Sequence, residues 1–188
     1  AACLAGVMSP EDALVLVALR GRLISGLERG AMLAVPLGEP EIRPMLGGAL
    51  SLAAVNAPKL CVVSGPTPAV ERLEADLRNR GVEPVRLHTS HAFHSKMMEP
   101  VLAEFAHCVS GLKLNVPGLP YVSNVSGTWI TGQEATDPQY WVSHLREAVR
   151  FSDVIQLLLK DDRPVFLEVG PGSTLTGLVR QHARTGAQ

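Results

Sequence analysis

Half of the histidines in the chain, His88, His91 and His94, fall within one stretch of seven residues. Phe93 lies between the last two. Histidine is the side chain whose ordinary pKa lies near neutral pH, so such a cluster indicates proton transfer or metal binding. The spacing matches no common zinc pattern, and the chain has neither an H-E-x-x-H motif nor a Cys/His pairing, so we expect no metal site. The remaining alternative is structural, with histidines that only pack where a strand turns into a helix.

A histidine that acts as a general base needs a nucleophile, and the serines of this chain show no familiar motif for one. Ser64-Gly65 and Ser126-Gly127 lack the flanking glycine of G-x-S-x-G and the strand-to-helix elbow that this motif forms. Gly170–Thr174 resembles a phosphate loop only loosely, because it has no lysine. It is interpreted as a tight turn before a helix. Local motifs alone therefore leave both hypotheses for the histidines open.

The composition is that of an ordinary soluble globular protein, with 188 residues, 46% of them hydrophobic, and a formal net charge of −1. There is no basic excess that would favour nucleic acid and no apolar run long enough to cross a bilayer. Cys3, Cys61 and Cys108 are few and far apart, so a reduced cytoplasmic setting fits best. The chain opens on apolar residues without a basic leader, and is interpreted as part of something longer.

Between Ala31 and His88, short apolar runs alternate with two helical patterns. Their order is β-α-β-β-α-β, the pattern of a ferredoxin-like subdomain. The predicted elements are strands at 31–37, 50–55, 60–64 and 82–88 and helices at 39–46 and 68–80.

The flanking residues are expected to form a larger α/β part. Ser9 caps a helix that runs to Leu19 and is apolar all round, so this helix is expected to be buried on most sides. The later predicted elements are helices at 96–107, 139–145, 149–159 and 174–182, an extended segment at 114–125 with its strand core at 121–125, a polar loop at 127–138, and a buried parallel strand at 164–169.

The predicted organisation is thus a large α/β subdomain made of residues 1–29 and 91–188, into which a small subdomain of residues 30–90 is inserted. The stretch from His88 to His94 lies where the chain leaves the insert. A cleft between two subdomains is a favoured place for a small-molecule site.

Several motifs, in register and spread over essentially the whole chain, resemble the acyltransferase domains of modular type I polyketide synthases. Those domains are similar to the malonyl-CoA:acyl carrier protein transacylases of fatty acid synthesis. The fold that the resemblance implies is an α/β-hydrolase-like large subdomain with a ferredoxin-like (βαββαβ) insert. The motifs are Ala1-Ala-Cys-Leu-Ala-Gly-Val-Met-Ser-Pro-Glu-Asp-Ala13, Arg20-Gly-Arg22, Asn56-Ala-Pro58 with Val63-Ser-Gly65, His91-Ala-Phe-His94, Tyr140-Trp141 with Leu145-Arg146, Val149-Arg-Phe151 and Glu168-Val-Gly-Pro-Gly172.

The resemblance implies acyl transfer through a serine ester and assigns a role to five residues. His94 is the general base that activates the serine of a G-H-S-x-G motif. Arg20 grips the free carboxylate of a malonyl group. The backbone carbonyl of His144 orients the catalytic imidazole. His91 and Phe93 belong to the form His-Ala-Phe-His, which the family associates with malonyl units, since Phe93 fills the space that a branching methyl needs.

The resemblance also implies substrates and partners. Malonyl-CoA is the substrate, no cofactor is permanently bound, and the acyl group passes to the phosphopantetheine thiol of an acyl carrier protein. Ketosynthase and linker regions of the same polypeptide are expected, but neither nucleic acid nor a membrane. The nucleophilic serine is expected before Ala1, so the chain alone is expected to be inactive. Two alternatives stay open, a standalone transacylase of fatty acid synthesis and a non-catalytic docking module of the same fold.

Overall fold

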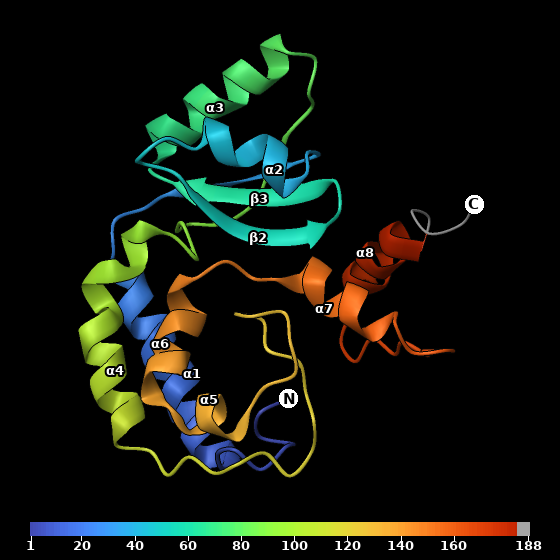
Figure 1. The fold of residues 1–188 in the computed structure, drawn as a ribbon. Coiled ribbons are helices and arrows are strands. Elements are labelled where there is room, and N and C mark those ends of the chain that lie inside the picture. The colour runs from blue at the N-terminus through green and yellow to red at the C-terminus, as the bar shows by residue number, and fades with distance from the viewer. Residues whose placement is uncertain (184–188) are drawn as a thin grey trace.

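A computed structural model describes residues 1–183 of the chain and arranges them in two parts, one above the other in Figure 1. The upper part is a small sheet covered by helices α2 and α3. The lower part is a group of helices that includes α1, α4, α5 and α6. Residues 184–188, the end of the predicted large subdomain, lie outside the described residues.

The small sheet has four antiparallel strands in the order β2-β3-β1-β4, which confirms the ferredoxin-like arrangement. The fourth strand is shorter than predicted, with two residues instead of seven. The elements are strands β1 (Ala31–Val35), β2 (Ser51–Ala57), β3 (Leu60–Gly65) and β4 (Val85–Arg86), helices α2 (Glu39–Ile42) and α3 (Thr67–Asn79), and the 3-10 helix η1 (Arg43–Met45).

The two faces of this sheet bury different partners because successive side chains of a strand point to opposite faces. Leu33 and Val63 pack with Val70 and Leu77 of α3, and none of the four exposes any surface. The opposite face carries a second cluster, formed by Met32, Ala53 and Val62, against which Leu87 and Phe93 pack. The second face of the sheet therefore supports the stretch that contains the histidines.

The helical part packs around its own apolar cluster, to which α1, η2, α4 and α6 contribute Leu16, Met98, Phe105 and Leu145. The helix α1 starts as predicted, since the Ser9 hydroxyl accepts a hydrogen bond from the Asp12 amide and Pro10 takes the first helical position. The elements are α1 (Pro10–Ser25), the 3-10 helix η2 (Lys96–Val101), α4 (Leu102–Ser110), α5 (Gly132–Thr136), α6 (Pro138–Arg146), α7 (Phe151–Leu158) and α8 (Thr174–Ala183).

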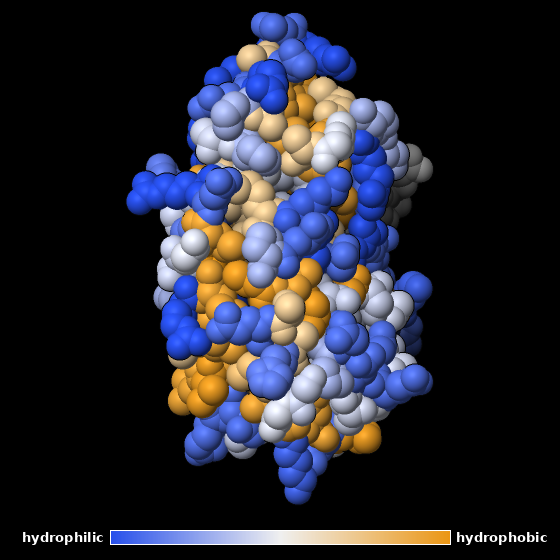
Figure 2. All heavy atoms as spheres, turned by 90° about the vertical axis from the view of Figure 1, so that its left-hand side faces the viewer, coloured by the Kyte–Doolittle hydropathy of each residue, from blue (hydrophilic) through white to orange (hydrophobic). Residues whose placement is uncertain are grey.

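The expectation that α1 is buried on most sides was wrong. Only Leu16 and Ile24 of this helix are buried, while Leu14 is 71% exposed and Val17 is 67% exposed. An apolar side chain is buried only where another layer covers it, and the described contacts of α1 are with α4 and η2. Exposed apolar side chains gather on the face of the helical part that Figure 2 shows.

Two strand predictions were also wrong. The segment 164–169 is not a strand, and Val165 is 94% exposed. Tyr121–Val125 forms no strand either, but only an isolated bridge between Val122 and Trp129. Within residues 1–183 the segment 164–169 belongs to no sheet, whereas Tyr121–Val125 pairs briefly with residues 128–130. There the Ser123 amide donates to the Thr128 carbonyl and the Ile130 amide donates to the Tyr121 carbonyl. The loop predicted at 127–138 contains the short helix α5, which Thr131 caps.

The subdomain boundaries at residues 29/30 and 90/91 stay a prediction, although the two main apolar clusters draw on different parts of the chain. Among residues 1–183, every helix is too short or too polar to cross a membrane.

Gly30 lies where the chain enters the sheet, and it offers a test of how tightly the two parts meet. A Cβ added there would lie 2.7 Å from the Ala92 Cβ and 2.9 Å from the Gly65 carbonyl oxygen. Gly30→Ala should therefore lower the free energy of unfolding by about 1–3 kcal/mol, because overpacking forces backbone shifts. Urea denaturation measures the change. Gly48→Ala is the control, since nothing lies within 4 Å of its added Cβ. Equal effects of the two changes would contradict the close approach.

Candidate active site

His94 sits on a turn that its neighbours hold in an unusual backbone conformation. Its φ of 55° makes it the one non-glycine residue with a positive φ among residues 1–183. Such a conformation is strained and persists where surrounding contacts over-determine it. Here the buried hydroxyl of Ser95 donates to the Ala92 carbonyl at 2.6 Å, and the buried hydroxyl of Ser64 donates to the Phe93 carbonyl at 2.8 Å. The turn therefore presents the His94 imidazole in one fixed direction.

In the part of the chain that the structure describes, the imidazole of His94 makes one hydrogen bond, 2.8 Å from Nδ1 to the backbone carbonyl oxygen of Glu147. A carbonyl oxygen can only accept, so Nδ1 carries the proton and donates it. In the neutral ring the lone pair is then on Nε2, and within residues 1–183 no hydrogen bond occupies that atom. This is the tautomer that a general base needs.

The acceptor for His94 differs from the predicted one. The expectation was the carbonyl of His144, but the structure has the carbonyl of Glu147, three residues later. The reason is the end of helix α6. His144 lies inside the helix, whereas Glu147 follows its last residue and has an extended backbone, with φ −80° and ψ 163°. The only sequence signal for this position was the predicted end of the helix near residue 145.

The side chain of His144 has surroundings of its own. Its ring centroid lies 6.3 Å from that of Tyr140 and 6.1 Å from that of Trp141. Burial, together with the charges of Arg20 and His94, lowers the pKa of His144 to about 4. The side chain is therefore neutral at physiological pH.

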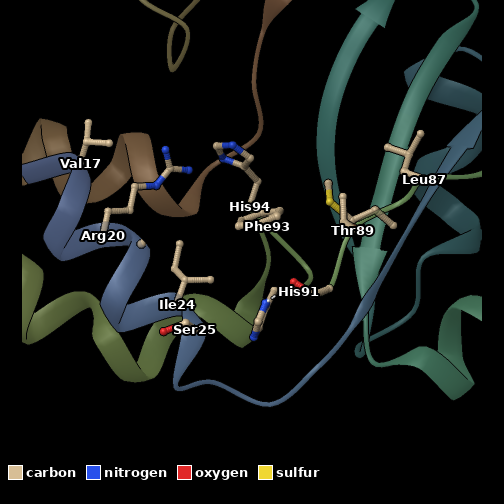
Figure 3. A pocket seen from close by; sticks show the side chains of 12 residues that line it. Val17, Arg20, Ile24, Ser25, Leu87, Thr89, His91, Phe93 and His94 are labelled. Atoms are coloured by element: carbon tan, nitrogen blue, oxygen red, sulfur yellow. Dashed lines mark hydrogen bonds between the residues drawn. The ribbon is translucent and has the colours of Figure 1, made fainter.

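Arg20 extends from α1 toward the imidazole of His94, as Figure 3 shows. Among the described residues no carboxylate forms an ion pair with it, and its buried Nε has no hydrogen-bond partner. Its neighbour Arg22, in contrast, is exposed and lies 3.4 Å from a carboxylate oxygen of Glu104. A half-buried guanidinium without an anion is an open position for the carboxylate of a ligand.

Arg20, Phe93 and His94 line one cleft of about 690 Å³ (Figure 3). It lies between α1 and the stretch in which the chain leaves the sheet after β4. That volume is typical of small-molecule sites. Thr89 adds a hydroxyl that sequence reasoning missed, and its buried Oγ1 has no hydrogen-bond partner among residues 1–183. The lining consists of Val17, Arg20, Gly21, Ile24, Ser25, Met32, Leu87, Thr89, Ser90, His91, Phe93 and His94.

His91 also lines the cleft, but both of its ring nitrogens are engaged elsewhere. Nε2 donates to the Leu27 carbonyl at 3.3 Å, and Nδ1 accepts from the Ser90 hydroxyl at 2.8 Å. The residue is buried and ties the histidine stretch to the end of α1. His88 takes no part in the lining. Within residues 1–183 the histidines, cysteines and carboxylates form no group of three that could hold a metal ion.

A family model described as "Acyl transferase domain" matches residues 1–188. The chain belongs to the acyl transferase domain family. Polyketide synthase GfsA of Streptomyces halstedii is 44% identical over an alignment of 181 residues, which covers 94% of this chain and 2% of that protein. Spectinabilin polyketide synthase system protein NorB of Streptomyces orinoci is 42% identical over an alignment of 196 residues, which covers 100% of this chain and 9% of that protein. The chain thus spans a small share of the length of these relatives.

Solved acyltransferases confirm the fold of this acyltransferase domain. The acyl transferase domain of SpnD, in complex with 2-(pent-4-yn-1-yl)malonyl, has a TM-score of 0.92 and 49% identity, covering 96% of this chain and 44% of that chain. The malonyl CoA-acyl carrier protein transacylase from Burkholderia pseudomallei has a TM-score of 0.89 and 31% identity, covering 99% of this chain and 67% of that chain. The resemblance and the fold class predicted from the sequence are therefore confirmed.

In this acyltransferase domain the cleft keeps His94 in its basic form. Burial lowers the pKa of His94, the hydrogen bond to the Glu147 carbonyl opposes that change, and the positive charge of Arg20 lowers the pKa further. Burial also lowers the pKa of Arg20, but a guanidinium stays protonated at neutral pH. A neutral imidazole thus lies beside a cation, which suits proton removal next to a bound anion.

The coupling between Arg20 and His94 can be measured by titration. Arg20→Gln removes a positive charge that lowers the pKa of both His94 and His144, so both pKa values should rise. NMR titration of the imidazole carbon-bound protons measures them. Arg22→Gln is the matched control, because the side chain of Arg22 is 73% exposed and pairs with Glu104. A pKa of His94 that stays constant or falls in Arg20→Gln would contradict the electrostatic contact.

Proposed function

We propose that this acyltransferase domain transfers a malonyl unit from malonyl-CoA to the phosphopantetheine thiol of an acyl carrier protein, within a polyketide synthase. One observation carries the proposal. The cleft holds a histidine in the basic tautomer together with an arginine that has no anion of its own among the described residues. A base and an anion receptor in one cleft suit acyl groups that carry a free carboxylate.

The chemistry assigned to His94 is proton transfer in two steps. Its Nε2 takes the proton of a serine hydroxyl as the serine oxygen attacks the thioester carbon, and returns that proton to the sulfur of the departing CoA. In the second step Nε2 takes the proton of the phosphopantetheine thiol. The thiolate attacks the serine ester, and the proton goes back to the serine oxygen. We propose that this serine belongs to the polypeptide outside these 188 residues.

Arg20 and Phe93 are assigned to recognition. The guanidinium of Arg20 holds the malonyl carboxylate, and the ring of Phe93 occupies the wall where a substituent on the malonyl carbon would lie. Phe93 packs against the apolar clusters on both sides of it, which supports the role of a fixed wall. The buried His91 stays a proposed marker of selectivity, and we assign it the role of keeping the ring of Phe93 in place.

The remaining parts of the proposal concern partners. The acyl carrier protein supplies the accepting thiol, and the polyketide synthase relatives support a location beside ketosynthase and linker regions. No permanently bound cofactor is proposed. A standalone transacylase of fatty acid synthesis is the second candidate, favoured by the shared fold with the Burkholderia enzyme.

The role of His94 predicts a specific loss of activity. In the polypeptide that carries both this chain and the proposed serine, His94→Ala should lower kcat/KM for malonyl transfer about 10²–10⁴-fold, the usual contribution of a general base. Mass spectrometry of the malonylated enzyme and carrier protein follows both steps. His88→Ala is the matched control, because His88 lies outside the lining of the cleft. An unchanged rate in His94→Ala would remove His94 from the mechanism.

The assignments of Phe93 and Arg20 predict different outcomes for substrate choice. Phe93→Ala should raise kcat/KM for methylmalonyl relative to malonyl about 10-fold or more, since one methyl group is worth about 1–3 kcal/mol. Arg20→Gln should lower kcat/KM for both substrates and leave their ratio unchanged, because both carry the carboxylate. Competition between the two CoA esters, read by mass spectrometry, measures the ratio. If Arg20→Gln shifts the ratio and Phe93→Ala does not, both assignments are wrong.

A further inference from the structure

The carbonyl that holds His94 lies at the start of a short segment, Glu147–Arg150, which links α6 to α7. This segment is fastened to the sheet by backbone hydrogen bonds on either side of Ala54. The Val149 amide donates to the Ala53 carbonyl, and the Val149 carbonyl accepts from the Val55 amide, both at 2.9 Å. The position of the Glu147 carbonyl is therefore set by strand β2 as well as by the end of α6.

Arg150 is the last residue of this segment and anchors it through hydrogen bonds from both its backbone and its side chain. Its amide donates to the Asn124 carbonyl at 2.8 Å. Its Nη1 donates to Glu39 in α2 at 2.8 Å, and its Nε donates to Asp153 in α7. The side chains of Arg150 and Glu39 are 25% and 20% exposed, so this ion pair is better shielded than an ordinary surface pair.

The packing around Arg150 leaves little freedom. Gly127 has a φ of +71°, and a Cβ added to it would lie 2.5 Å from the Asp153 Cβ and 3.5 Å from the Arg150 Cβ. On the other side, Arg43 also forms an ion pair with Glu39. The guanidinium of Arg150 thus sits between two carboxylates from separate helices, with the loop of Asn124 and Gly127 packed against its base.

We infer that Arg150, through its ion pair with Glu39, is a positioning residue that sets the Glu147 carbonyl and thereby the tautomer of His94. Arg150 does not line the cleft and touches no reacting atom. Its catalytic consequence rests on the proposed function, but its effect on the imidazole does not. The alternative is that Arg150 only adds stability where the two parts meet.

The imidazole itself provides the direct test. In Arg150→Met, the ring ¹⁵N chemical shifts of His94 should move from the form protonated at Nδ1 toward a mixture of tautomers. The pKa of His94 should fall, because the hydrogen bond to Glu147 is the contact that raises it. Glu39→Gln should do the same if Arg150→Met fails to fold, and Arg150→Lys should restore part of the original signal.

Arg86→Met is the matched control. Arg86 forms a comparable bond, 2.8 Å to Glu74, on strand β4, and has no described contact with the segment 147–150. It should lower stability in urea without changing the ¹⁵N shifts of His94. If Arg150→Met and Glu39→Gln leave those shifts unchanged, or if Arg86→Met changes them equally, the inference is wrong.

Activity separates the inference from the proposed function. In the polypeptide with the serine, Arg150→Met should lower kcat for malonyl transfer by up to about 100-fold, with KM for malonyl-CoA little changed, because misplacement acts on the base. If the ¹⁵N shifts move in Arg150→Met while His94→Ala keeps full activity, the inference holds and the proposed function fails. If His94→Ala loses activity and the ¹⁵N shifts stay constant in Arg150→Met, the proposed function holds and the inference fails.

Discussion

The site depends on one hydrogen bond, from Nδ1 of His94 to the backbone carbonyl of Glu147, which joins residues 53 positions apart in the chain. Because a carbonyl cannot donate, this contact leaves the lone pair of the neutral ring on Nε2. The positive φ of His94, the end of α6 at Arg146 and the bridge from Val149 to β2 all bring the two atoms together. A backbone acceptor also makes the site insensitive to the side chain at position 147.

Electrostatics complements that geometry. Arg20 is half-buried without an anion among the described residues, and its charge opposes protonation of both His94 and His144. Desolvating a lone guanidinium is costly, and a ligand carboxylate would offset that cost. Under the proposed function, the same carboxylate would also offset the influence of Arg20 on His94. The base would then become stronger when the acyl group is in place.

The small sheet and the helical part contribute to the site in different ways. One face of the sheet closes its own core against α3, and the other face supports Phe93. The segment Glu147–Arg150 instead joins the edge strand β2 through backbone hydrogen bonds. The helical part supplies Arg20 from α1 and the carbonyl at the end of α6. The cleft is thus built where the two parts meet, and its lining comes from α1, from the sheet and from the stretch that follows the sheet.

Periodicity, caps and turns in the sequence were enough for the succession of strands and helices from Ala31 to His88, the start of α1 at Ser9 and most helices, because these depend on contacts close along the chain. The motifs spread over the whole chain, with His91-Ala-Phe-His94 and Arg20 among them, were sufficient to indicate the family. The burial of α1 and the strand at 164–169 were predicted wrongly. The apolar composition of a segment does not tell whether another layer of the structure covers that segment. The acceptor at Glu147, the contact of His91 with Leu27 and the ion pair between Arg150 and Glu39 were decided only by the tertiary structure. Each joins residues distant in sequence, and a backbone carbonyl leaves no signature in residue type.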